Sequence, residues 1–391
     1  MPTKPDRGVY PYTTAAGETR WRISFDAPPV FDPETGEVKR RQTNRRGFRG
    51  VREANKALRE ELAKVESDTH VPHSRTALGS YLMTWLEGID VKDTTRASYA
   101  QQVRLRILPY EVAAMRLQDV KAEHLSALYR RVLAEGGADG GPLSPKSVRK
   151  VHEVLSRALG DARRHGYIHR NPAEDATPPK LIRTEMQVWS REELRAFLAH
   201  VAEDRLYALW LLYATTGMRR GEGLGLRWED VDLEAGTVFI RRQRTIVEGV
   251  VVEHEEPKSS ASRRKIAVDA ETATALRRHR TAQAQERLAA GPGWEDGDYV
   301  FTWEDGRGLH PKTVSKWFTK HVVAAGLRPI RPHDLRHSFA SIALANNVPI
   351  TVVSRRLGHA SVSITLDVYS HVMPTDDAEA AEKVAGLILG S

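Results

Sequence analysis

A proline-rich break near the middle of the chain does most to limit how this sequence can fold. Residues 171–179 read Asn-Pro-Ala-Glu-Asp-Ala-Thr-Pro-Pro, and these prolines cannot continue a helix. Helical spacing of apolar residues is found on both sides of the break. The sequence therefore predicts a linker over residues 171–184 between two domains. The length of 391 residues agrees, because one domain usually holds roughly 100–200 residues.

The region before the break is predicted to be helical throughout. Leu78, Tyr81, Leu82 and Trp85 recur at the spacing that places them on one face of a helix. The same periodicity continues in further segments, which cover about residues 94–108, 121–133 and 145–165. We expect residues 72–170 to form one all-helical domain.

The N-terminal block, residues 1–65, carries a concentrated positive charge. It holds 14 Lys and Arg against 9 Asp and Glu, a net +5 out of +8 for the whole chain. Residues 21–25 and 38–43 alternate as strands do around a turn at 33–37, and residues 51–65 have helical spacing, so a small β-sheet-plus-helix module is expected. Its candidate nucleic-acid-binding residues are Arg40, Arg41, Arg45, Arg46 and Arg49. A solvated charged surface is the alternative interpretation.

The region after the break mixes helices with short strands. Ser190 and Glu193 are spaced as a capping box, which predicts a helix beginning at Ser190, and another buried helix is expected over residues 206–214. Strands are expected near residues 238–240, 245–252 and 266–268, with a turn at Glu248-Gly249. Residues 185–391 are therefore predicted to be a mixed helical domain with a small antiparallel sheet. The fold class predicted for the chain is α+β, mainly helical.

The composition excludes several chemistries. The chain has no cysteine, so disulfides, thiolate zinc sites, iron–sulfur clusters and a cysteine nucleophile are ruled out. No apolar run reaches the roughly 18 residues that a membrane span needs, and none follows Met1 as a secretory signal requires. We expect a protein of the cytosol with no membrane partner. The chain has 59 Lys and Arg against 51 Asp and Glu, and this positive net charge is expected of a protein that binds a polyphosphate.

Cations and histidines gather in short segments of the last domain. Arg219 and Arg220 follow a Thr-Gly break at a predicted helix start, where backbone N–H groups favour anions. His333 and Arg336 are three residues apart, so on a helix they share one face and could bind the same anion. For each segment taken alone, a solvated surface is the alternative.

A zinc site is a second interpretation of one of these segments. His333 and His337 have the ligand spacing of the zinc helix of metalloproteases, and Asp334 stands where that motif has its Glu. Asp is one methylene shorter than Glu, and Arg336 sets a fixed cation on the same face. Both features argue against a metallohydrolase, and no metal site is predicted.

Six residues of the last domain, taken in order, resemble the signature of the tyrosine recombinase family. They are Arg219, Lys258, His333, Arg336, His359 and Tyr369. Their flanks agree as well: Ala-Thr-Thr-Gly-Met-Arg, Pro-Lys before a strand, His-Asp-Leu-Arg-His-Ser-Phe-Ala, Leu-Gly-His, and a tyrosine ten residues after that histidine. The resemblance is to phage and mobile-element integrases of actinobacterial type, and it is strong over residues 185–375. Among eleven tyrosines, the choice of Tyr369 depends on this resemblance.

The resemblance implies three DNA-handling parts and a reaction. Residues 1–65 are similar to an arm-type DNA-binding module, residues 72–170 to a core-DNA-binding domain, and residues 185–391 to the catalytic domain with a C-terminal tail. The implied activity is site-specific DNA recombination through a 3′-phosphotyrosyl intermediate, which integrates or excises a phage or mobile element. The implied partners are double-stranded DNA at attachment sites and a homotetramer on that DNA, with a directionality factor or host DNA-bending protein as further candidates.

The resemblance also implies a role for each site residue. Tyr369 is the nucleophile, whose phenol ionises near pH 10 and leaves more readily than an aliphatic alkoxide. The remaining implied roles are phosphate clamping by Arg219 and Arg336, hydrogen-bond donation by His359, proton transfer near the tyrosine by His333, general acid catalysis by Lys258, and orientation of these groups by Glu222 and Asp334. The roles of the two histidines can also be exchanged. No metal or nucleotide cofactor is implied. The alternative is a catalytically inactive DNA-binding regulator of the same fold, against which the six intact residues count.

Overall fold

The computed structural model describes residues 4–31, 38–66, 71, 74–181, 187–255 and 263–370, with 382, 385, 388 and 389 in the C-terminal tail. The chain divides into two compact units, Met1–Ile182 and Arg183–Ser391. The predicted turn at 33–37 and most of the C-terminal tail lie outside the described residues.

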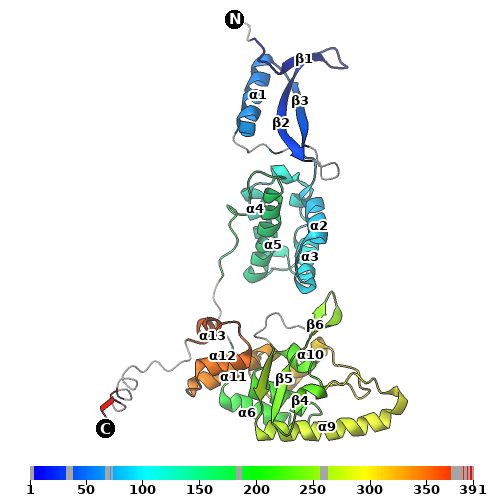
Figure 1. Cartoon of the computed structure of the whole chain (residues 1–391), viewed down its shortest axis with the longest axis vertical. Helices are drawn as coiled ribbons and strands as arrows, with labels where there is room; N and C mark the ends of the chain where they lie inside the picture. The colour runs from blue at the N-terminus through cyan, green and yellow to red at the C-terminus, as the bar shows by residue number, and fades with distance from the viewer. Residues whose placement is uncertain are drawn as a thin grey trace. The chain divides into compact units, whose positions relative to one another are not determined.

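The first unit begins with a three-stranded sheet and one helix. The elements are β1 (Val9–Thr13), β2 (Thr19–Phe31), β3 (Val38–Phe48) and α1 (Val51–Glu66). The strands are antiparallel in the order β1-β2-β3, and α1 lies along one face of the sheet (Figure 1). A small core forms where Ile23 and Phe25 of the sheet meet Ala54 and Leu58 of the helix. Alternation in β2 thus buries one face of the strand and leaves the other to solvent.

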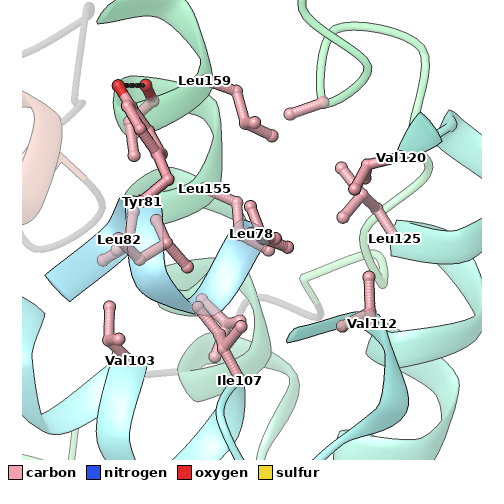
Figure 2. Close-up of a cluster of buried hydrophobic side chains, with 14 of the residues drawn as sticks. Leu78, Tyr81, Leu82, Val103, Ile107, Val112, Val120, Leu125, Leu155 and Leu159 are labelled. Atoms are coloured by element: carbon pink, nitrogen blue, oxygen red, sulfur yellow. Dashed lines mark hydrogen bonds between the residues drawn. The ribbon is translucent and has the colours of Figure 1, made fainter. Parts of the chain in front are cut away.

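The rest of the first unit is an all-helical bundle. Its helices are α2 (Leu78–Gly88), α3 (Asp93–Arg106), α4 (Ala122–Glu135) and α5 (Pro145–Arg164), with short 3-10 turns η1 (Glu111–Ala114) and η2 (Leu117–Asp119). Ser144 caps α5, and Pro145 occupies its first turn, where a missing N–H is harmless. Figure 2 shows the apolar side chains that these helices share, and the Tyr81 hydroxyl donates to the Ala158 carbonyl at 2.8 Å.

Part of the segment predicted as a linker packs on this bundle. Ala173 and Ala176 are buried in its core, and the Asn171 side chain donates to the Ser156 carbonyl at 3.0 Å. Helix α5 already ends at Arg164, before the first of these prolines, and the short alanines between the prolines contact apolar surface.

The second unit is built around a helix that is buried on nearly every side. This helix is α7 (Tyr207–Thr216), which α6 (Arg191–His200), α9 (Ala270–Ala290) and α11 (Pro332–Ala345) contact. The remaining helices are α8 (Arg220–Leu224), α10 (Pro311–Ala324), α12 (Ile350–Leu357) and α13 (Val362–Tyr369), with 3-10 turns η3 (Trp228–Asp230) and η5 (Gly291–Gly293). The capping box of Ser190 and Glu193 is present at the start of α6, as predicted.

The strands of the second unit form one small sheet and one hairpin. The sheet has the antiparallel order β4 (Val231–Asp232), β5 (Thr237–Ile240), β8 (Arg264–Ala267). The hairpin pairs β6 (Gln243–Val247) with β7 (Val250–His254). Glu248 and Gly249 both have positive φ, of 49° and 89°, which is the turn that the sequence indicates there.

Candidate active site

Arg336 is the most deeply buried cation of the predicted set. It lies in the second turn of α11 with 3% of its surface exposed. Its guanidinium donates to the carbonyl oxygens of Gly217 at 2.9 Å and Leu357 at 2.6 Å, which are the C-terminal ends of α7 and α12. Helix C-termini carry only partial negative charge, so the guanidinium is held but not neutralised.

The electrostatic surroundings of Arg336 favour an incoming anion. Burial and the neighbouring charge of Arg219 lower the pKa of Arg336 to about 9. No carboxylate in the described part of the chain is hydrogen-bonded to this guanidinium. A buried cation without a hydrogen-bonded counterion is unfavourable, and a phosphate placed beside it reduces that penalty.

Arg219 is held in place by the buried carboxylate of Glu222. It lies directly before α8, and Glu222 accepts from its guanidinium at 2.8 Å and from its backbone N–H at 2.8 Å. Arg264 of β8 donates two further hydrogen bonds to the same carboxylate, at 2.8 and 3.0 Å. Burial by itself raises the pKa of Glu222, but the bonds and charges of Arg264 and Arg219 outweigh it and lower the pKa to about 2.

The turn after α12 brings His359 to the same place. Gly358 ends the helix at φ +65°, and the Arg219 guanidinium donates to its carbonyl at 3.5 Å. Nδ1 of His359 lies 2.8 Å from the Thr365 hydroxyl, which fixes the ring. Burial and the charges of Arg336 and Arg219 lower the pKa of His359 to about 4, so the ring is neutral at pH 7.

Tyr369 is the last residue of α13 and is buried, with 1% of its surface exposed. Its ring packs in an apolar cluster of α11, α12 and α13 that includes Leu344 and Leu357. Its hydroxyl lies 2.6 Å from Nδ1 of His337. Burial raises the pKa of Tyr369 to about 12, although the charge of Arg336 acts in the opposite direction.

His333 lies one helical turn before His337 on α11. The two rings meet edge to face, with centroids 5.1 Å apart. Part of His333 remains open to solvent, while burial of the remainder and the neighbouring His337 and Arg336 lower its pKa to about 4. Asp334, between these residues, caps α11 through the Arg331 N–H at 2.8 Å and pairs with the Arg331 guanidinium.

The predicted residues thus fall into two groups that meet at Arg336. In one group Arg219 is bonded to Glu222 and to the Gly358 carbonyl next to His359, and in the other Tyr369 is bonded to His337. Asp334 was expected to orient an arginine or a histidine of the site. Its hydrogen-bond partner is instead Arg331, which is not one of the predicted site residues. Lys258 lies outside the described residues, in the segment between β7 and β8.

Two residues of this site carry no role in the sequence prediction. Arg264 is buried beneath Gly358 and also donates to the Arg356 carbonyl at 2.6 Å. His337 contacts the tyrosine hydroxyl, whereas the sequence pattern offers it only as a possible zinc ligand. The four-residue spacing from His333 was a signal for His337, but no local pattern marks Arg264, because its partner is 42 positions away.

The basic residues of the N-terminal module are only partly free. Arg41, Arg46 and Arg49 are exposed, whereas Arg45 donates to Glu61 of α1 at 2.7 Å. The side chain of Arg40 lies outside the described residues. Arg46 also lies over the ring of Tyr12, with its guanidinium carbon 5.9 Å from the centroid.

The described part of the chain holds neither a cluster of metal ligands nor a membrane-spanning helix. No three His, Asp or Glu side chains gather there as a metal would need. Among the described helices, none is both long and apolar enough to cross a membrane.

Known proteins with the same features identify the family. The phage integrase family matches residues 187–375, which include all six predicted catalytic residues. Residues 187–375 are thus a phage integrase domain, and the chain is a tyrosine-type site-specific recombinase.

Full-length relatives agree with this assignment. A tyrosine recombinase XerC-like protein of Caldanaerobacter subterraneus subsp. tengcongensis is 28% identical over 361 residues, which cover 86% of this chain and 90% of the relative. The ICEBs1 integrase of Bacillus subtilis is 27% identical, with 95% of this chain and 98% of the relative covered. An integrase of Streptomyces ambofaciens is 28% identical, with 90% of each covered.

Solved structures share the fold at low sequence identity. The Tn1549 transposon integrase in complex with a circular intermediate DNA has a TM-score of 0.65 at 19% identity, covering 78% of this chain and 98% of that one. A lambda integrase dimer bound to a COC' core site has a TM-score of 0.54 at 17% identity, covering 94% and 96%. These likenesses confirm the predicted fold class.

Proposed function

We propose that this recombinase uses Tyr369 to cleave DNA at specific sites and to rejoin it, so that a phage or mobile element is integrated or excised. The phenolic oxygen attacks a backbone phosphorus, which leaves a 3′-phosphotyrosyl link and a free 5′-hydroxyl. That hydroxyl attacks the link of a partner strand and exchanges the strands. The observation that supports the proposal is the buried guanidinium of Arg336, which has no hydrogen-bonded carboxylate among the described residues and lies within electrostatic range of Arg219, His359 and Tyr369.

The two arginines supply the charge that the reaction needs. The pentavalent phosphorus carries extra negative charge on its non-bridging oxygens, and guanidinium groups match that geometry. Arg336 is fixed by two carbonyls and Arg219 by Glu222, so little reorganisation is required when charge develops. With that charge in place, and with each broken bond replaced by one of the same kind, we expect neither a metal ion nor ATP to be needed.

The neutral imidazoles suit hydrogen bonding to the phosphate. His359 is anchored through Nδ1, and the hydrogen bonds of the described residues leave its Nε2 for a ligand oxygen. His333, partly open to solvent on the first turn of α11, is a second donor to the same group. We assign Lys258 as the acid that protonates the departing 5′-oxygen, on the resemblance alone.

The three parts of the chain are proposed to bind different stretches of DNA. Residues 1–65 serve arm-type sites, residues 72–170 and 185–391 bind the core site, and residues 171–184 link them. Double-stranded DNA is the proposed partner, and the structurally similar Tn1549 integrase supports this because it was solved in complex with a circular intermediate DNA. Because lambda integrase is known as a tetramer bound to a Holliday junction, we expect four copies of this chain on DNA in the bacterial cytosol.

A trapping experiment tests the proposal. The probe is a duplex from the junction of the mobile element that carries the gene, nicked so that the cleaved fragment diffuses away. We expect a covalent protein–DNA adduct that survives denaturant and forms equally well in EDTA. Tyr369→Phe should form none, whereas Tyr207→Phe, a change in the same unit, should match the wild type. No adduct on a duplex that the protein binds, or an adduct with Tyr369→Phe, would overturn the proposal.

A further inference from the structure

His337 makes the one hydrogen bond that the described residues give to the Tyr369 hydroxyl. The distance from the oxygen to Nδ1 is 2.6 Å, and the two rings lie with centroids 5.8 Å apart. The contact joins the middle of α11 to the end of α13, where the Tyr369 ring packs in the apolar cluster that includes Leu344 and Leu357. Geometry of this kind is what a proton acceptor requires, because proton transfer takes place within hydrogen-bond reach.

We propose that His337, and not His333, is the base that accepts the phenol proton when Tyr369 attacks DNA. This inference rests on the proposed function of Tyr369 as the nucleophile. In the attack, the O–H bond of Tyr369 breaks as an N–H bond forms at Nδ1 of His337. The new bond joins the phenolic oxygen to phosphorus, and the bond from phosphorus to the 5′-oxygen breaks, with a proton supplied to that oxygen by the general acid. Strand joining reverses each of these steps.

The surroundings keep the His337 ring able to accept. Burial lowers the pKa of His337, Asp334 raises it, and the guanidiniums of Arg336 and Arg331 lower it further. Tyr369 faces the ring from α13, His333 faces it from one turn before on α11, and His359 lies within electrostatic range after α12. The ring is therefore neutral at pH 7, and with its hydrogen on Nε2 the lone pair of Nδ1 faces the phenol.

The nucleophile itself needs such a base. The pKa of Tyr369 is raised to about 12 by burial, so the phenol is almost entirely protonated at neutral pH. His333 contacts the ring of His337 edge-on, and no contact in the described structure joins it to the tyrosine. His333 thus remains available to the phosphate, while His337 remains with the nucleophile.

Two substitutions separate a base from a simple anchor. His337→Asn keeps an oxygen that can accept a hydrogen bond from the phenol but cannot take its proton, and His337→Ala removes both functions. In single-turnover cleavage of the nicked duplex by the full chain, we expect both variants to slow adduct formation by about 10²–10⁴-fold while the affinity for DNA stays unchanged. Their rates should then rise with pH well above neutrality, because the phenol must ionise by itself. The control is His200→Ala, an exposed histidine at the end of α6, which should match the wild type.

A substrate with sulfur in place of the 5′-bridging oxygen identifies which proton-transfer step each variant has lost. A thiolate leaves without protonation, so this substrate should rescue Lys258→Ala and leave the His337→Asn defect in place. Three results would each overturn the inference and leave the Tyr369 adduct in place. The first is a wild-type rate for His337→Asn, and the second is rescue of His337→Asn by sulfur. The third is faster cleavage by His337→Ala, as expected if His337 only restrains the tyrosine. A wild-type chain that forms no adduct would overturn the proposed function instead.

Discussion

At the scale of single residues, the buried carboxylate of Glu222 organises two arginines. It binds Arg219, which is proposed to hold the phosphate, and Arg264, which is itself buried against the carbonyl of Arg356. Removal of one partner from a buried ion pair leaves the other charge without compensation, and this is more unfavourable than the pair was favourable. The position of Arg219 therefore depends on a buried carboxylate to which we assign no step of the reaction.

Glu222→Gln tests this dependence. We expect the free energy of unfolding to fall by about 3–5 kcal/mol, because two guanidiniums lose their counterion. Glu234→Gln, at an exposed carboxylate, should change stability little. The measurement is chemical denaturation of both variants beside the wild type, and equal stability of the two variants would contradict the role given to Glu222.

The same residue predicts a pH dependence. The pKa of Glu222 is lowered from 4.5 to about 2, so its contribution to stability is fully present above pH 4.5 and is lost as the pH falls toward 2. The unfolding temperature of the wild type should therefore fall over that interval by more than the unfolding temperature of Glu222→Gln. Parallel curves for the two proteins would show that this carboxylate is not the group responsible.

At the scale of elements, the end of α12 sets where His359 lies. Gly358 adopts φ +65°, and a Cβ at this position would lie 2.8 Å from the Arg264 guanidinium. Gly326 has the same φ, with nothing within 4 Å of such a Cβ. The two glycines thus share a backbone requirement, but only one of them is packed against the site.

Alanine at each glycine separates the two effects. Both Gly358→Ala and Gly326→Ala should lower the free energy of unfolding by roughly 1–2 kcal/mol, because alanine is strained in the left-handed backbone conformation. Only Gly358→Ala should also slow adduct formation, because the added carbon displaces Arg264 and the turn that carries His359. Cleavage rates on the nicked duplex and unfolding midpoints check this, and identical cleavage by the two variants would count against it.

The elements were predictable from the sequence where local signals decide them. The Ser190 capping box and the Glu248-Gly249 turn occur where the pattern places them. The contacts of the site were not predictable in the same way. Arg264 meets Glu222 across 42 positions, and His337 meets Tyr369 across 32, so only the packing of helices and strands brings them together. The chain has eleven tyrosines, and no local physical property of the sequence distinguishes Tyr369 from the others. Only the family motif selects it.

At the scale of the whole molecule, charge is unevenly distributed between the parts. The first 65 residues hold a net +5 of the chain's +8, and Arg41, Arg46 and Arg49 are exposed there. Phosphate contacts by such residues release counterions, so binding weakens steeply as salt rises. This module is the part of the chain whose removal should change DNA affinity without changing the chemistry.

Deletion of residues 1–65 tests that division of labour. We expect cleavage of an isolated core site to be retained and integration at a complete attachment site to be reduced. Arg41→Glu with Arg46→Glu should act in the same direction and should make binding to arm-type DNA less sensitive to salt. The rates of both reactions check this, and an equal loss of both would refute a separate arm-binding role.

The central claim is that the oxygen of Tyr369 becomes bonded to DNA. The most direct measurement is to digest the trapped adduct with protease and nuclease and to locate the remaining nucleotide by tandem mass spectrometry. We predict one modified peptide, with the nucleotide joined through its 3′-phosphate to Tyr369. A nucleotide found on any other residue would contradict the account.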